Sequence, residues 1–395
     1  NFNQPIGSWD VSQVKDMAKM FAGATFNQPI DSWDVSQVTS IYGVFAYATF
    51  NQPLDSWDVS QVKDMARMFS DAYYFNQPID SWDVSQVTNM NGMFVDARSF
   101  NQPIDSWDVS QVKDMFRMFS GNSFFGATNF NQPIDSWNVS QVNYMGRMFA
   151  DSTFNHTIYS WDVSQVNFMN NMFGGATFNQ PIDSWDVSQV KNMGSMFSSA
   201  YYFNQPIDSW DVSQVTYMRF MLGGTTFNQP IDSWDVSQVK DMYGMFRRAG
   251  FFNQPIDSWN VSQVESMNVI FRGATSFDQS IDSWDVSQVN DMSGMFRYAD
   301  SFNHPLDSWN VSQVNDMSKM FRSADSFNRP IDSWDVSQVE FMDSMFRNAD
   351  SFNKPIDTWN VSTVENMFGM LYGAFSFNQC LSTWAEKTSD TVRTS

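Results

Sequence analysis

Pairs of aspartates three residues apart recur along the chain, as in Asp80 and Asp83. Two neighbouring carboxylates can act as general acid and base, and carboxylate oxygens are also the ligands that Ca²⁺ prefers. The first aspartate of the pair recurs in thirteen places, whereas an enzyme builds one site rather than a row. We therefore interpret this series as a solvated acidic edge, with calcium bridging as the alternative and these residues as its candidate ligands: Asp55, Asp80 and Asp105.

The second aspartate of each pair has a structural interpretation. It is replaced by asparagine at four places, Asn138, Asn260, Asn310 and Asn360. Aspartate and asparagine share a side-chain oxygen that accepts hydrogen bonds, so the sequence D/N-V-S predicts an Asx-turn or a cap that bonds a backbone N–H two or three residues on.

Cysteine and histidine are too scarce to build a reactive centre. The chain has one cysteine, Cys380, and two histidines, His156 and His304, which lie far apart in the sequence. A zinc site or a Cys–His nucleophile needs several such groups together, and an intrachain disulfide needs two cysteines. We therefore expect no catalytic residue, no enzyme activity and no cofactor, with Ca²⁺ as the one alternative.

The elements that hold these polar residues form a repeat, which decides the fold. Each unit begins with phenylalanine and runs for 24 or 25 residues, except that 30 residues separate Phe100 from Phe130 and indicate an insertion near 120–129. The units start at Phe2, Phe26, Phe50, Phe75, Phe100, Phe130, Phe154, Phe178, Phe203, Phe227, Phe252, Phe277, Phe302, Phe327, Phe352 and Phe377.

Apolar residues keep one register through all units. All sixteen tryptophans lie seven residues after the unit phenylalanine, and all 27 methionines lie fifteen or eighteen residues after it. The few replacements of methionine are apolar: Ile41, Val44 and Ile270. One unit cannot bury its own apolar face, whereas stacked units share a continuous core. We predict a single solenoid of about sixteen coils over 1–384, with 385–395 as a C-terminal tail or cap.

Each coil is expected to contain one short strand and one helical turn. Asn76 and Pro78 indicate a turn, and 79–84 (IDSWDV) reads as the strand. The apolar residues of 87–94 are spaced as in a helical or 3₁₀ turn. Strands of successive coils would pair in parallel about 4.8 Å apart. Identical side chains would then form ladders, including hydrogen-bonded amides of the FNQ segment.

The repeat FNQPIDSWDVSQVTNMNGMF at 75–94 resembles the BspA-type leucine-rich-repeat family, in its DUF285 branch of surface proteins. The Phe-Asn-Gln-Pro, Trp-Asp-Val-Ser and Val-x-x-Met-x-x-Met-Phe runs make this resemblance, which covers nearly the whole chain. It implies a right-handed, leucine-rich-repeat-like solenoid with short parallel strands. It also implies a secreted or cell-surface protein that acts in adhesion and protein–protein recognition, and it brings no catalytic residues.

Aromatic residues are frequent where the units differ from one another. Such side chains are predicted to be exposed and to form a contact surface for a protein or glycan, with drift on a tolerant surface as the alternative. The candidates are Tyr42, Tyr73, Tyr74, Phe116, Phe124, Phe125, Tyr144, Phe168, Tyr217, Tyr243 and Phe341.

Charge excludes some partners. The formal net charge is −21, whereas nucleic acid calls for a basic footprint. No apolar run is long enough for a transmembrane helix. One basic column recurs in five late units, followed by aspartates three residues on, and we expect an ion-pair edge or, alternatively, a patch for an anionic partner. Its members are Arg247, Arg272, Arg297, Arg322 and Arg347, with Asp300, Asp325 and Asp350.

Five N-x-S/T sequons would be glycosylated in a secreted eukaryotic protein: Asn138, Asn155, Asn260, Asn310 and Asn360. Four of them coincide with the Asx positions, so the match has a structural alternative.

Two functions remain open. The first is extracellular recognition through the variable aromatic face. The second is architectural, because near-identical coils without a polar cap can stack end to end into a fibre or wall lattice. The chain starts inside a unit, so we expect it to derive from a longer protein.

Overall fold

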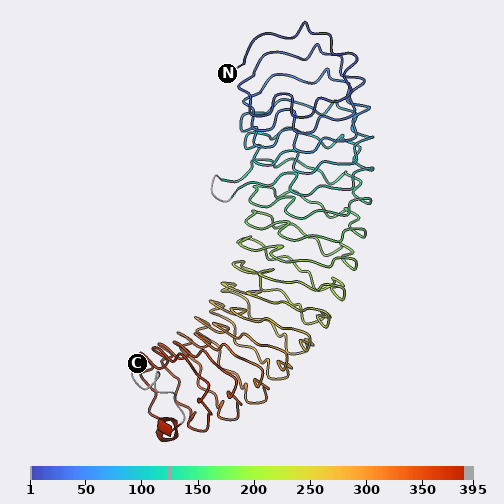
Figure 1. Cartoon of the computed structure of the whole chain (residues 1–395). Coiled ribbons are helices and arrows are strands. Elements are labelled where there is room, and N and C mark those ends of the chain that lie inside the picture. The colour runs from blue at the N-terminus through green and yellow to red at the C-terminus, as the bar shows by residue number, and fades with distance from the viewer. Residues whose placement is uncertain (1, 123–125, 387–395) are drawn as a thin grey trace. The chain divides into compact units, whose positions relative to one another are not determined.

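The chain winds into stacked coils. A computed structural model describes residues 2–122 and 126–386. It divides into two compact units, Asn1–Val190 with Met196–Gln205, and Lys191–Ser195 with Pro206–Ser395. Within each unit, successive coils of the chain lie side by side (Figure 1). The predicted repeat solenoid is therefore confirmed within each unit.

Identical side chains stack on one another inside the coils, as predicted. The rings of Trp82 and Trp107 lie 6.4 Å apart and within 5° of parallel. The unit phenylalanines stack in the same way, with 6.0 Å between Phe75 and Phe100. Met90 is fully buried beside them. Burying one such side chain contributes roughly 1.5–3 kcal/mol, so the ladders supply the core that one coil alone lacks.

The tryptophans that follow another coil also make a hydrogen bond that the sequence did not indicate. The indole Nε1–H of Trp82 donates to the backbone oxygen of Leu54 in the preceding coil, at 2.9 Å. Trp107 donates to Ile79 in the same way, at 3.0 Å. A buried indole N–H needs such a partner. The bond therefore explains why no other aromatic residue replaces tryptophan in this register.

The predicted strand over 79–84 is wrong. The backbone N–H of Trp82 bonds to the Ile79 oxygen at 3.3 Å and closes a turn there, while the Trp107 indole takes the same oxygen. That carbonyl is therefore occupied and cannot join a parallel ladder. Single parallel bridges between coils form farther along the unit instead, as between Asn89 and Asp114.

The predicted helical turn over 87–94 is also wrong. The segment consists of β-turns: Met93 N–H bonds to Met90 oxygen at 3.1 Å, but Gly92 N–H bonds outward to Phe116 oxygen in the next coil at 2.8 Å. Alternate backbone N–H groups thus donate within the segment and to the next coil in turn. A β-turn closes over three residues as a 3₁₀ turn does, which is why the apolar spacing suggested a helix.

Two columns of left-handed backbone accompany these turns, at positions 17 and 21 counted from the unit phenylalanine. Gly92 has φ 59° and Asp96 has φ 52°, whereas a 3₁₀ helix needs negative φ. Glycine fits such positions, yet many coils place other residues there. Val269, with φ 52°, is β-branched and the most strained type among them.

The predicted Asx-turns are confirmed. The Asp83 carboxylate accepts the backbone N–H of Ser85 at 3.0 Å. Asn138 accepts the N–H of Ser140 at 3.2 Å in the same geometry. This shared bond explains why aspartate and asparagine alternate at the second acidic position.

The predicted amide ladder is also present. Asn76 Oδ1 accepts the backbone N–H of Asn101 at 3.0 Å and the side-chain N–H of Gln102 at 3.2 Å. This ladder runs along the FNQ segments and ties coil to coil through side chains.

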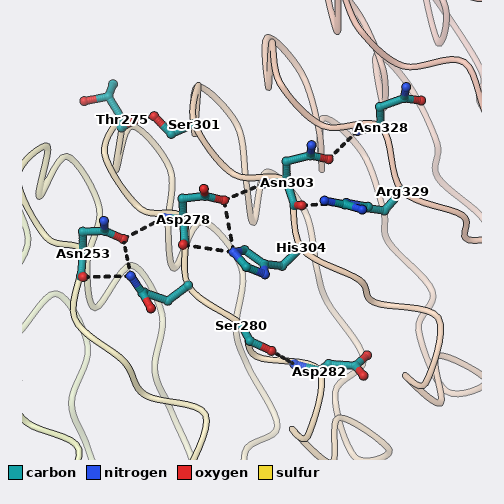
Figure 2. A network of polar contacts seen from close by, with 11 residues as sticks. Asn253, Thr275, Asp278, Ser280, Asp282, Ser301, Asn303, His304, Asn328 and Arg329 are labelled. Carbon is teal, nitrogen blue, oxygen red and sulfur yellow. Dashed lines mark hydrogen bonds and ion pairs between the residues drawn. The ribbon is translucent and has the colours of Figure 1, made fainter.

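Figure 2 shows a stretch of this ladder in which other residues take the amide positions. Asp278 replaces asparagine and accepts the N–H of Asn303 at 3.1 Å. His304 replaces glutamine, and its Nε2 lies 3.0 Å from the Asp278 backbone oxygen. Arg329 donates through Nε to the Asn303 oxygen at 2.7 Å. His304 is therefore a member of the scaffold.

Two residues of the predicted insertion pair with each other. Asn122 and Gly126 form an antiparallel bridge, and Thr128 then bridges in parallel to Ser152 of the next coil. The Thr128 hydroxyl donates to the Phe119 oxygen at 2.7 Å. The stack therefore resumes its register at Thr128.

The described residues contain one regular helix, the 3₁₀ helix η1 (Ser382–Glu386). Trp384 within it keeps the register of the ladder, since its indole N–H donates to the Ile356 oxygen at 3.2 Å. Most of the predicted tail or cap, 387–395, lies outside the described residues. No helix among the described residues is long and apolar enough to span a membrane.

We expect Val269→Gly to stabilise the protein by about 1 kcal/mol, because it relieves a β-branched residue held at positive φ. The reverse change, Gly43→Val, should destabilise by a similar amount, since Gly43 has φ 58° and a Cβ there would meet only ordinary contacts. Denaturation followed by tryptophan fluorescence measures both. A lower midpoint for Val269→Gly would show that side-chain packing outweighs backbone strain.

The Asx-turns predict a loss of stability in acid. Hydrogen bonds from Ser85 hold the pKa of the Asp83 carboxyl below its ordinary value, and Ser237 does the same for Asp235. Each carboxylate therefore contributes stability that is present above the unfolded pKa of about 3.9. That contribution is lost as pH falls through the lower folded pKa.

The variant Asp83→Asn/Asp235→Asn keeps both turns without this titration. We would measure urea unfolding midpoints from neutral to acid pH. The wild-type midpoint should be higher than that of the variant at pH 7, and the difference between the two midpoints should vanish in acid. A constant difference across the range would contradict the assignment.

Candidate functional site

The turns give every coil a variable outer surface, which we call the turn face. It consists of the side chains at positions 16, 17, 20 and 21, which in the coil from Phe75 are Asn91, Gly92, Val95 and Asp96. These positions flank the buried methionines and the second phenylalanine, so the core fixes their backbone but not their chemistry.

The predicted aromatic contact surface separates into three columns. One column lies at position 14, where the bridges form, and its members are exposed: Tyr144, Phe168, Tyr217 and Phe341. A second belongs to the turn face and is half-buried: Tyr42, Phe116 and Tyr243. Exposed Tyr73 and Tyr74 lie in the loop before the next unit. Phe124 and Phe125 lie outside the described residues.

Tyr144 and Phe168 form an exposed aromatic pair. They bridge neighbouring coils, and their rings lie 5.4 Å apart and within 3° of parallel. The two side chains are 48% and 37% exposed. The same position holds Asp114 in the preceding coil and Asn192 in the following one, so the aromatic pair is not a requirement of the stack.

The predicted ion-pair edge is wrong. No arginine of the basic column pairs with Asp300, Asp325 or Asp350; Arg297 lies over the Tyr298 ring at 4.8 Å instead. The physical reason is position, because the arginines belong to the turn face whereas the aspartates follow it in the loop. Cation–π contact with rings nearby is the stable alternative.

Each of these two columns therefore stacks like charges. Burial lowers the pKa of the Arg272 guanidinium, assisted by Arg297 and Arg247. Burial and the neighbouring Asp325 raise the pKa of Asp300. The Nε atoms of four members are buried without a hydrogen-bond partner: Arg247, Arg297, Arg322 and Arg347.

Ion pairs do occur, but between residues that the sequence analysis did not pair. Lys319 Nζ lies 3.2 Å from the Asp343 carboxylate, and Arg219 Nε lies 3.4 Å from that of Asp241. Both pairs join a coil to the next one. Nothing in the repeat pattern singles them out, because each uses two positions of different register.

The candidate calcium ligands Asp55, Asp80 and Asp105 are exposed. Across residues 2–122 and 126–386, no three His, Cys, Asp or Glu side chains gather as they would around an ion. The backbone oxygens of Asp55 and Asp80 instead accept the hydroxyls of Ser81 and Ser106 in the next coils, at 3.0 and 2.8 Å.

The sequon asparagines are all exposed. Asn155 belongs to the amide ladder, where its Oδ1 accepts the N–H of Asn179 at 2.9 Å. The other four belong to Asx-turns: Asn138, Asn260, Asn310 and Asn360.

A pocket of about 320 Å³ opens in the turn face of the first unit. The repeat pattern gave no signal for it, because its walls use the turn-face positions that every coil has, with Asn122 of the insertion added. Aromatic, basic and acidic side chains face it together: Tyr47, Arg67, Asp71, Asp96, Phe116 and Arg117.

Comparison with known families now identifies the repeat. A family described as "Mycoplasma protein of unknown function, DUF285" matches residues 1–49, 26–126, 121–233, 203–308 and 302–394. The chain belongs to the DUF285 family. These overlapping matches extend over almost all coils of the DUF285 protein, in agreement with its regular ladders.

Other comparisons are weaker. No curated protein matches the chain. A leucine-rich-repeat protein from Bacteroides ovatus is 10% identical with a TM-score of 0.31, over 90% of this chain and 82% of that one. A leucine-rich-repeat protein from Leptospira interrogans is 8% identical with a TM-score of 0.26, over 91% and 95%. Likeness at this level adds nothing to the coil geometry above.

Proposed function

We propose that this DUF285 protein is a non-catalytic recognition protein, secreted or displayed on a cell surface, that binds protein or glycan partners in adhesion. The observation that supports it best is the exposed Tyr144–Phe168 pair. Exposed aromatic rings on a soluble surface are typical of contact sites.

The scaffold suits such a role. Both residues lie on coils whose backbone is bonded on either side, as in the donation of Met145 N–H to Phe168 oxygen at 3.1 Å. Rings held in this way lose little conformational entropy on binding. Full burial of such a side chain contributes roughly 1.5–3 kcal/mol, and covering the 48% and 37% still exposed on Tyr144 and Phe168 would contribute a part of this.

The resemblance of the repeat to BspA-type surface proteins supports the extracellular and adhesive parts of the proposal. The recurring polar residues support its non-catalytic part, because they serve turns and ladders. Asp83 holds an Asx-turn and Asn76 holds the amide ladder.

The recognition proposal predicts that Tyr144→Ser/Phe168→Ser loses binding without losing stability. Serine occupies the same position naturally at Ser40 and Ser266, so the change should stay within about 0.5 kcal/mol. We would apply the labelled chain to an array of immobilised extracellular-matrix proteins and glycans. At least one partner should bind the wild type and bind this variant at least tenfold more weakly.

Tyr159→Ser is the matched control. Tyr159 is 49% exposed but lies at position 5, away from the aromatic column. It should bind as the wild type does. Equal losses in both variants, or no bound partner for the wild type, would overturn the proposal.

The architectural alternative also has an observation in its favour. Each coil bonds the next with the same groups, as when Gly92 N–H donates to Phe116 oxygen and Gly43 N–H to Ala66 oxygen. A ladder of this kind can in principle continue onto a second copy of the chain.

Light scattering with Ca²⁺ and then with chelator separates the two functions. A recognition protein should remain a monomer of 45.5 kDa in both conditions. Assemblies that dissociate in chelator would show that the acidic edge is bridged by cations. Assemblies that persist would show end-to-end stacking and favour the fibre.

A further inference from the structure

The turn-face pocket is lined by residues of several coils and by one residue of the insertion. Its walls come from successive coils of the first unit, through Tyr47, Arg67, Asp96 and Phe116. Asn122, which belongs to the insertion, lines one side. The one irregular unit of the chain therefore borders this pocket.

Asp96 is the unusual group in this pocket. Its residue is only 4% exposed, and its Oδ1 has no hydrogen-bond partner among the described residues. The backbone fixes it, since its N–H bonds to the Ser120 oxygen at 2.8 Å. Burial and Asp71 raise the pKa of its carboxyl. A buried acceptor without a partner is costly, and a donor from a ligand would remove that cost.

The charges around Asp96 balance. Arg67 and Arg117 contribute two guanidiniums, and Asp71 and Asp96 contribute two carboxylates. Ser70 already donates its hydroxyl to Asp71 at 2.9 Å. A pocket with no net formal charge gives an ionic ligand little advantage. It suits a neutral molecule that offers several donors and acceptors.

Aromatic rings supply the remaining walls. Phe116 is half-buried, and Tyr47 is 63% exposed at the rim. Asn91 adds an amide whose Nδ2 donates to Asp114 at 3.1 Å, which leaves its oxygen as an acceptor. Rings pack against C–H faces, while carboxylate, amide and guanidinium groups each offer paired atoms to adjacent hydroxyls.

We propose that the turn-face pocket binds a neutral hexose unit of a glycan. This inference rests on the proposed recognition function and names a ligand class for it. In it, the Asp96 carboxylate accepts a sugar hydroxyl, Arg117 donates to a second oxygen, and Phe116 packs against the ring. The pocket volume of about 320 Å³ is at the lower end of ligand sites, in keeping with one or two sugar rings.

The test uses the full chain and the methyl glycosides of glucose, galactose, mannose and N-acetylglucosamine. Saturation-transfer NMR and calorimetry should detect at least one of them. Asp96→Asn keeps the shape of the side chain and suits its left-handed backbone, so it should fold. It should weaken binding at least tenfold and, without sugar, should raise the thermal midpoint, because it removes a negative charge that is buried beside Asp71.

Asp151→Asn is the matched control. Asp151 has the same register and φ 51°, and burial raises its pKa as well, but it does not line the pocket. It should bind the sugar as the wild type does. Equal weakening in both variants would overturn the assignment, as would the absence of binding by all four glycosides at millimolar concentration.

The failures of the two proposals are distinguishable. Tyr144→Ser/Phe168→Ser should retain sugar binding, since neither residue lines the pocket. Array binding that depends on Tyr144 and Phe168, without any glycoside binding, would contradict the proposed sugar site and leave the recognition function standing. Preferential binding of an acidic or basic peptide that depends on Asp96 would replace the sugar by a peptide.

Discussion

The structure depends on the way each coil divides its backbone N–H groups. In the turn segments, alternate groups close turns within the coil and donate to the next coil, as Met93 and Gly92 do. This division is accompanied by positive φ at two positions in nearly every coil. It also places the methionines and the second phenylalanine on one side and leaves the turn face on the other. Core and recognition surface are thus two sides of one hydrogen-bond pattern.

The stacked core tolerates replacement of methionine but not of tryptophan. Methionine yields to Ile41, Val44 or Ile270, which fill similar space. Tryptophan has no substitute, because its indole N–H serves a carbonyl of the preceding coil. Positions on the outer surface need neither a particular side-chain volume nor a hydrogen bond to the preceding coil. That freedom allows Tyr144 and Phe168 to replace polar residues and allows an unsatisfied Asp96 to persist where the ladders hold its backbone.

Much of the fold could be predicted from the sequence. The repeat, the buried register, the Asx-turns and the amide ladder all depend on residue types that recur at fixed spacing. The strand over 79–84 was wrong, because the Ile79 oxygen is already taken. The helical turn was wrong, because turns and 3₁₀ helices share a spacing of three residues. The pocket around Asp96 could not be predicted, since its walls use turn-face positions that recur in every coil and only the side chains on them differ.

The tryptophan hydrogen bonds have a direction. Trp82 and Trp107 donate to the coil before them, and Gln102 does the same through its amide. A coil therefore finds the acceptors for these tryptophan and glutamine side chains on residues that a ribosome has already made. Synthesis from the N-terminus can extend such a stack one coil at a time, each docking on a finished template. For these side-chain bonds the order of translation and the polarity of the ladder coincide, whereas the backbone N–H groups of the turn segments find their acceptors when the next coil docks. A nascent chain would therefore not wait for its C-terminus before burying its core.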